Sequence, residues 1–353
     1  MEAAKRKYIL KLKQEVIEGK RGSSYSAMRK LGVRDSETNS NILDLPQHLE
    51  ENLTPSQSAE RIADFFSSIS QEYDPLVLAF LPPNLRNYME SARGYPNPHV
   101  LQEYKVYQKI MKSKKPSSLV PGDLPVKLVK EFDVELSIPI TKIFNKINQT
   151  LEYPSQWKIE YQTPIPKVPH PVDEGQLRNI SKTSFFSKNY ESFLCDWLLP
   201  FINPFLDPGQ CGGLSQSSIT HYLIKLLHFC HYNLDQRDPH AVILAMVDMM
   251  KAFNRVSHNI LMQDLFDMHV PGWLLCIIAS YLSSRSMILH FHGAQSSRRE
   301  LPGGGPQGAL LGGIIFIVKF NGAALRPSIP RFIFTPQFKN QLKERNVVSV
   351  KLT

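Results

Sequence analysis

The chain has 353 residues and a formal net charge of +9 at pH 7, with 42% hydrophobic and 21% charged residues. This balance is ordinary for a globular protein and excludes a fibrous or wholly disordered chain. Its four cysteines form no CxxC pair, so neither a zinc ribbon nor a disulfide framework is indicated. The most apolar stretches, 273–282 and 310–320, are too short to span a bilayer. We therefore expect a soluble intracellular protein without membrane contact, in the nucleus or the cytoplasm.

Most of the positive charge lies in residues 1–34, which hold ten Lys and Arg against three Glu. The apolar residues between Tyr8 and Ile17 recur at helical spacing, which predicts a basic amphipathic helix. A solvated helical face is one interpretation. The other is contact with nucleic-acid phosphates, which needs no base specificity. The candidate phosphate contacts are Lys5, Arg6, Lys7, Lys11 and Lys13.

The next segment carries a helix start signal. Thr54 can cap, Pro55 fits the first turn, and Gln57 can reach back to the cap. The helix that follows should bury Ala59, Ile62, Ala63, Phe66 and Ile69. Five prolines between residues 75 and 98 predict a linker into the main domain. Further helices are predicted at 104–115, 124–130 and 138–151, with a turn at 121–123.

Residues 157–167 read as a strand that runs into residues 163–167, whose prolines keep that end extended and at a sheet edge. Residues 216–234 predict an amphipathic helix. Its inner face should hold Ile219, Leu223, Leu226 and Cys230, and its opposite side His221, His228 and His231. Those imidazoles suggest a metal site, but a structural zinc takes four ligands, usually from two elements, and no second cluster is present. We favour a solvated or hydrogen-bonded face.

Residues 241–247 form an unbroken apolar run, which is typical of a buried strand and brings Asp248 to its end. Burying an unpaired carboxylate costs several kcal/mol, so we expect Asp248 at the exposed strand end, bound to a cation or a donor. A helix-capping Asp ahead of 251–258 is the alternative.

The elements predicted after this stretch are helices at 259–268 and 272–283, a strand at 287–292 with a turn at 293–297, and a Gly-rich turn before a helix at 309–321.

Two of these stretches together resemble a known family. Asp248 with Phe253 five residues later, and Pro-Gln-Gly at 306–308 ahead of an apolar helix, resemble motifs A and B of reverse transcriptases from non-LTR retrotransposons, the jockey-like and LINE-like elements. Residues 157–167, 177–191 and 207–227 resemble that family's fingers-side motifs, so the resemblance covers roughly 101–331.

The resemblance implies an α+β fold with the fingers and a partial palm of a right-hand polymerase, preceded by a helical extension. The expected domains are a basic helical extension and linker at 1–100, a fingers-like region at 101–235, a partial palm at 236–325 and a divergent tail at 326–353. The implied activity is RNA-directed DNA synthesis, a nucleotidyl transfer with Mg²⁺, an RNA template, a DNA primer and dNTP as partners.

The resemblance also assigns roles. Asp248 becomes the catalytic residue and the first Mg²⁺ ligand. The residues expected around the dNTP are Lys167, Arg178, Met249, Phe253, Gln307 and Gly308. Lysine and arginine suit triphosphate oxygens, although ordinary surface charge is the alternative for both, and a core position is the alternative for Phe253. Asn254 and Asn179 depart from the family, which often has Asp and Pro at those positions. A P-loop is disfavoured because the Gly-rich run lacks the Gly-Lys-Ser/Thr ending.

One expected part is missing. The family's Asp-Asp pair follows motif B, whereas the last aspartate here is Asp267, and only Glu300 and Glu344 come after it. Two-metal catalysis needs more than one carboxylate supply, so we expect a truncated reading frame and a catalytically incomplete remnant. The alternative from a different class is a non-catalytic nucleic-acid-binding protein. A chain that does not fold stably is a third possibility, because a motif A strand left unpaired is an aggregation hazard.

Overall fold

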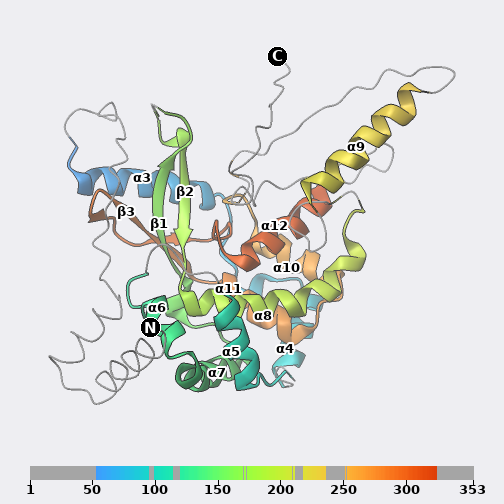
Figure 1. Cartoon of the computed structure of the whole chain (residues 1–353), viewed down its shortest axis with the longest axis horizontal. Helices are drawn as coiled ribbons and strands as arrows, with labels where there is room; N and C mark the ends of the chain where they lie inside the picture. Colours follow the sequence, from blue (N-terminus) through green and yellow to red (C-terminus); the bar gives the residue numbers. More distant parts are fainter. Residues whose placement is uncertain are drawn as a thin grey trace, which may run out of the picture.

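The fold is that of a computed structural model, which describes residues 53–94, 99–113, 120–169, 171, 173–208, 210, 218–235, 251 and 253–323. Over these residues helices combine with one sheet, as the predicted α+β class requires (Figure 1). Several predictions lie outside the described residues. They are the basic N-terminal helix with Lys5, Arg6, Lys7, Lys11 and Lys13, the strand at 241–247 with Asp248 and Met249, and the tail at 326–353.

The sheet has five strands in the order β2-β1-β3-β4, with β5 also paired to β3. The strands are β1 (Ile159–Pro166), β2 (Leu177–Lys182), β3 (Arg285–Phe291), β4 (Ala294–Gln295) and β5 (Arg299–Leu301). β1 and β2 form an antiparallel hairpin, whereas β1 and β3 are parallel although more than a hundred residues separate them.

The strand predicted at 157–167 is confirmed, and its proline-containing end lies at a sheet edge as expected. Ile159 to Gln162 pairs with β3 on one side, and Tyr161 to Pro166 pairs with β2 on the other. The half that contains Pro164 and Pro166 pairs with β2 alone. Proline lacks the N–H that a second ladder needs, so its edge preference applies to that half only.

Helix α3 (Pro55–Ser70) covers one face of the sheet. Its predicted start is confirmed, because the Gln57 amide donates to Thr54 Oγ1 at 3.3 Å and the Thr54 amide donates to Gln57 Oε1 at 2.9 Å. The predicted apolar face is also confirmed as buried, against Leu177, Met287, Leu289 and Leu301 of the sheet. Residues that the sequence assigned to the N-terminal extension thus contribute to the sheet's core.

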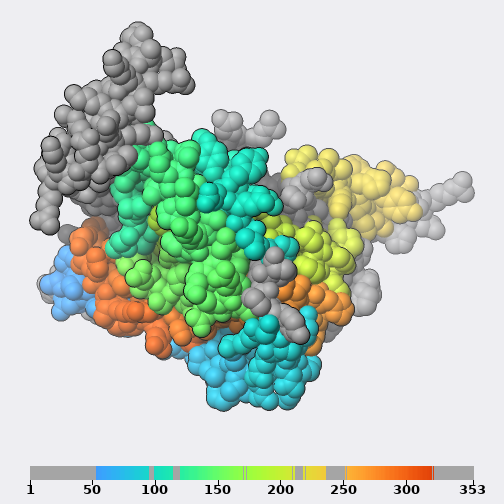
Figure 2. Space-filling model, turned by 90° about the horizontal axis from the view of Figure 1, so that it is seen from below, coloured from blue at the N-terminus to red at the C-terminus, as the bar shows by residue number. Residues whose placement is uncertain are grey.

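The other helices form the larger apolar core. They are α4 (Pro83–Arg93), α5 (Glu103–Lys112), α6 (Val126–Glu131), α7 (Asp133–Thr150), α8 (Phe185–Ile202), α10 (His258–Asp267), α11 (Gly272–Leu282) and α12 (Leu310–Ala323). Short 3₁₀ turns lie at η1 (Leu78–Phe80), η2 (Ser155–Lys158), η3 (Glu174–Gln176) and η4 (Asn203–Phe205). Close packing joins α11 to α4, α5 to α7, and α12 to α8. Figure 2 shows the green residues, which include α7, covering the middle of the lower face.

Helix α9 (Ile219–Leu234) differs from its prediction. Leu223 is 45% exposed, Leu226 and Cys230 are half-buried, and no described side chain of this helix is buried. In Figure 1 the helix projects away from the sheet. An apolar stripe indicates which face of a helix can be buried, but it does not identify the element that covers this face. No described element packs closely along α9.

Within the described ranges, every helix is too short or too polar to serve as a membrane span.

Candidate functional site

The Gly-rich loop, residues 302–309, is fixed to the segment that follows Asp248 in the sequence. The Gly304 amide donates to the Val256 carbonyl, and the Gly305 amide donates to the Phe253 carbonyl, both at 2.8 Å. Gly304 has a φ of +83°, and a Cβ there would lie 3.0 Å from backbone atoms of Phe253 and Asn254. Only glycine fits such a close approach in this conformation. The two stretches that carry the family resemblance are therefore in direct contact.

His258 adds a side-chain contact to the same loop. It opens α10, is 1% exposed, and places Nε2 2.6 Å from the Gly304 carbonyl oxygen. A carbonyl only accepts, so Nε2 must carry the proton, and the buried Nδ1 has no hydrogen-bond partner among the described residues. Burial lowers the pKa of His258 to about 4, and the nearby charge of Arg285 acts in the same direction. No local signal in the sequence marks His258 as functional, although it lies ten residues after Asp248.

The depressed pKa of His258 predicts acid-sensitive stability. Between its ordinary value of 6.5 and about 4, the unfolded chain binds a proton that the folded chain excludes. The free energy of unfolding should therefore fall as the pH drops through this window, by about 3 kcal/mol at most from this group. Stepped-pH thermal melts of wild type and His258→Gln test this. We expect a flatter slope in the variant, and equal slopes would contradict the prediction.

The second half of the loop contacts β2. The Ser181 amide donates to the Gln307 carbonyl at 3.2 Å. Gly308 has a φ of +114°, and a Cβ there would lie 3.4 Å from the Ser181 carbonyl oxygen. Phe253 stacks on Phe316 of α12, with ring centroids 4.9 Å apart. The structure therefore brings three of the predicted dNTP residues, Phe253, Gln307 and Gly308, to one place.

A small polar pocket opens beside this loop. It is lined by Ser70, Glu160, Gln162, Asn179, Ser181, Asn254, Arg285, Leu301, Gly303, Gly304, Gly305 and Gln307. Its floor holds a buried ion pair, in which Arg285 Nε donates to Glu160 Oε1 at 3.1 Å and Nη2 lies at the same distance from that oxygen. Ser181 Oγ donates to the other Glu160 oxygen at 2.7 Å. The pair joins β1 to β3 and helps hold β2, so it fixes the strands on which the loop rests.

Lys167 and Arg178 lie on the β1–β2 hairpin and do not line this pocket. Lys167 follows β1, is exposed, and donates from Nζ to the Gly175 carbonyl at 3.0 Å. Arg178 is also exposed and pairs across the hairpin with Ile165, two residues before Lys167. Because side chains alternate along a strand, the pairing places both cations on the same face of the hairpin. The pocket residues Gln162, Asn179 and Ser181 occupy the opposite face.

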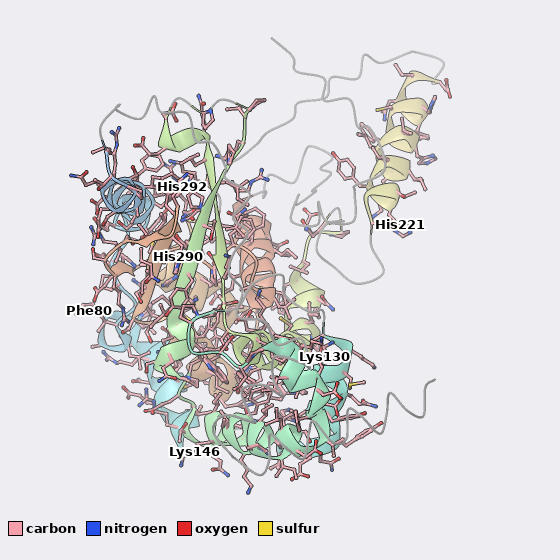
Figure 3. All side chains as sticks on the ribbon, turned by 60° about the vertical axis from the view of Figure 1, so that its left-hand side comes forward. Phe80, Lys130, Lys146, His221, His290 and His292 are labelled. Carbon is pink, nitrogen blue, oxygen red and sulfur yellow. The ribbon has the colours of Figure 1, made fainter. Side chains whose placement is uncertain are left out.

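The described residues provide no complete metal site. In the part of the chain that it describes, no three His, Cys, Asp or Glu residues gather closely enough to hold an ion, and Asp248 lies outside that part. Figure 3 shows His221 on α9 apart from His290 and His292 near β3.

Comparison with known proteins identifies the class. The reverse transcriptase (RNA-dependent DNA polymerase) family model matches residues 165–327, which include β2, the Gly-rich loop and His258. Residues 165–327 therefore correspond to a reverse transcriptase domain, a class of polymerase that generally uses divalent metal ions.

Individual similar proteins indicate which type of reverse transcriptase the chain resembles. The chain is 28% identical over 196 residues to the "Probable RNA-directed DNA polymerase from transposon BS" of Drosophila melanogaster, covering 54% of this chain and 21% of that protein. It is 27% identical to the corresponding protein of transposon X-element, covering 50% of this chain and 20% of that protein. It is 23% identical to the RNA-directed DNA polymerase from mobile element jockey, covering 74% and 29%. Both are also from Drosophila melanogaster. The resemblance to jockey-like, non-LTR reverse transcriptases is confirmed, and the chain spans less than a third of these relatives' length.

Proposed function

We propose that this chain contributes the fingers and part of the palm of an RNA-directed DNA polymerase, with an RNA template, a DNA primer and dNTP as substrates inside the cell. One observation carries the proposal. Within the matched residues, the Gly-rich loop is bonded both to the segment after Asp248 and to β2. This arrangement brings Phe253, Gln307 and Gly308 together, as a nucleotide site built from these motifs requires. The domain boundaries predicted from the sequence belong to this proposal.

We assign the dNTP triphosphate to the hairpin cations. Lys167 and Arg178 share the exposed hairpin face, where neither forms an ion pair with another described residue. A forked guanidinium and a mobile ammonium suit the oxygens of a polyphosphate. Asp248 is the proposed Mg²⁺ ligand and catalytic residue, and Met249 follows it. Magnesium bound there would stabilise the charge that develops on the transferring phosphoryl group.

We propose further that the 353 residues alone are catalytically incomplete. No aspartate occurs among them after Asp267, so the second carboxylate pair implied by the resemblance is not present. Primer extension on poly(rA) with oligo(dT), dTTP and Mg²⁺ or Mn²⁺ tests this. We expect no product from either wild type or Asp248→Ala, because the rate should fall by many orders of magnitude without the second carboxylate supply. Extension by wild type that is lost in Asp248→Ala would refute the incompleteness and confirm the assignment of Asp248.

A second candidate function is non-catalytic nucleic-acid binding, favoured by the ten Lys and Arg in residues 1–34. If this segment makes about five phosphate contacts with duplex, a plot of log K against log salt should slope by about −4 to −5. Fluorescence anisotropy in a salt series measures this slope. Deletion of 1–34 should flatten it and weaken binding at low salt. An unchanged slope after deletion would assign binding to the reverse transcriptase domain instead.

A further inference from the structure

The Gly-rich loop is held at both ends by buried ionisable side chains that the proposed reaction does not itself use. At its first half, His258 donates to the Gly304 carbonyl at 2.6 Å. Just beyond its second half, Glu191 Oε2 accepts from the Leu311 amide at 3.2 Å. Gln307 and Gly308, the proposed dNTP residues of the loop, lie between these two contacts.

Glu191 accepts a hydrogen bond from the first turn of α12. It lies on α8, is 0% exposed, and also accepts from Ser187 Oγ at 2.9 Å through its other oxygen. The first turn of any helix leaves amides without intrahelical partners, and a carboxylate there satisfies one and matches the positive end of the helix dipole. Burial raises the pKa of Glu191, while the Leu311 and Ser187 hydrogen bonds oppose that rise.

The amino-acid composition of the loop does little to restrict its backbone conformation. It has three consecutive glycines and two glycines at positive φ, and glycine loses more conformational freedom on ordering than any other residue. Its fixed position therefore depends on outside partners. His258 connects the loop to the segment that carries Phe253, and the Ser181 amide connects its second half to β2. Glu191 holds Leu311, two residues after the loop, against α8.

We infer that His258 and Glu191 are positioning residues that hold Gln307 and Gly308 at the spacing from Phe253 that nucleotide binding requires. This inference rests on the proposed function. Neither side chain needs to touch the nucleotide. Each acts by fixing one end of the loop, so the loss of either contact should widen the range of positions that the Gln307 backbone occupies.

Two pairs of variants separate positioning from simple loss of stability. His258→Gln keeps an amide donor near the position of Nε2, whereas His258→Leu has none. Glu191→Gln keeps a carbonyl acceptor for the Leu311 amide, whereas Glu191→Ala leaves that amide unpaired. His290→Leu is the control, since His290 is a half-buried histidine on β3 outside the loop contacts. A melting curve for each variant identifies any that fail to fold. If His258→Leu or Glu191→Ala fails to fold, His258→Gln and Glu191→Gln provide the test, because the inference expects both to stay near wild type.

The full chain is measured in two ways. Hydrogen exchange reports the protection of amides 303–305, 307 and 308, and equilibrium dialysis with an RNA–DNA primer–template reports affinity for the complementary dNTP. We expect His258→Leu and Glu191→Ala to speed exchange and to weaken dNTP affinity by about tenfold, as loss of a buried hydrogen bond predicts. Duplex affinity should be unchanged, and His258→Gln, Glu191→Gln and His290→Leu should stay near wild type.

The outcomes are distinct. Unchanged exchange in the Leu and Ala variants overturns the inference, as does faster exchange with unchanged dNTP affinity, and in both cases the proposed function stands. Equal loss in His258→Gln and His258→Leu also overturns it, because the donor then has no role. A wild-type chain that binds duplex but no dNTP refutes the nucleotide site of the proposed function, and the inference falls with it.

Discussion

Replacing Arg285 with methionine should lower the free energy of unfolding by about 3–5 kcal/mol, because it leaves Glu160 as an unpaired buried carboxylate. Both residues are only 2% exposed. Arg285 also donates from Nη1 to the Tyr281 carbonyl at 3.1 Å and lies over the Tyr281 ring, so its guanidinium joins α11 to the sheet. Urea denaturation followed by circular dichroism measures the change.

A double variant and a surface variant serve as controls. Glu160→Gln combined with Arg285→Met removes both charges and should recover part of the loss, since the cost comes chiefly from the orphaned carboxylate. Arg299 pairs with Glu60 at 2.8 Å and with Asp64 at 2.7 Å near the surface, so Arg299→Met should cost about 1 kcal/mol or less. Equal costs for Arg285→Met and Arg299→Met would show that burial does not set the energy of the Glu160 pair.

Gly304→Ala should cost about 3 kcal/mol or more and should weaken any nucleotide binding at the loop. Its φ of +83° costs a side chain roughly 1–2 kcal/mol. Contacts of 3.0 Å to backbone atoms add to this cost, because backbone cannot move aside as a flexible side chain can.

The β3–β4 turn offers a matched control for this prediction. Gly293 has a φ of +81°, and a Cβ there would meet nothing within 4 Å. Gly293→Ala should therefore show only the conformational cost, roughly 1–2 kcal/mol. The difference between the two variants in urea titrations isolates the effect of the close approach to Phe253 and Asn254. If both alanines cost the same, the tight contact between the loop and the motif A segment is not energetically significant.

Local signals in the sequence predicted individual elements well. The capping box at Thr54 and the apolar period of α3 both depend on residues within a few positions of one another, so a single chain segment contains the whole signal. The glycines ahead of α12 likewise predicted a tight turn, because positive φ is a property of one residue. The order of the motifs along the chain was also sufficient to indicate the reverse transcriptase resemblance, without any information on tertiary contacts.

Contacts between distant segments were decided only by the tertiary structure. Nothing near Glu160 indicates its partner Arg285, which lies 125 positions later, and nothing near His258 indicates that it binds a carbonyl 46 positions later. Parallel pairing of β1 with β3 and the exposure of the apolar stripe on α9 are of the same kind. A periodic pattern shows that a face needs covering, whereas the covering element is chosen by the packing of the whole chain. The sequence by itself thus determined several of the elements and the resemblance to reverse transcriptases, and the tertiary structure decided which buried side chains hold the Gly-rich loop in place.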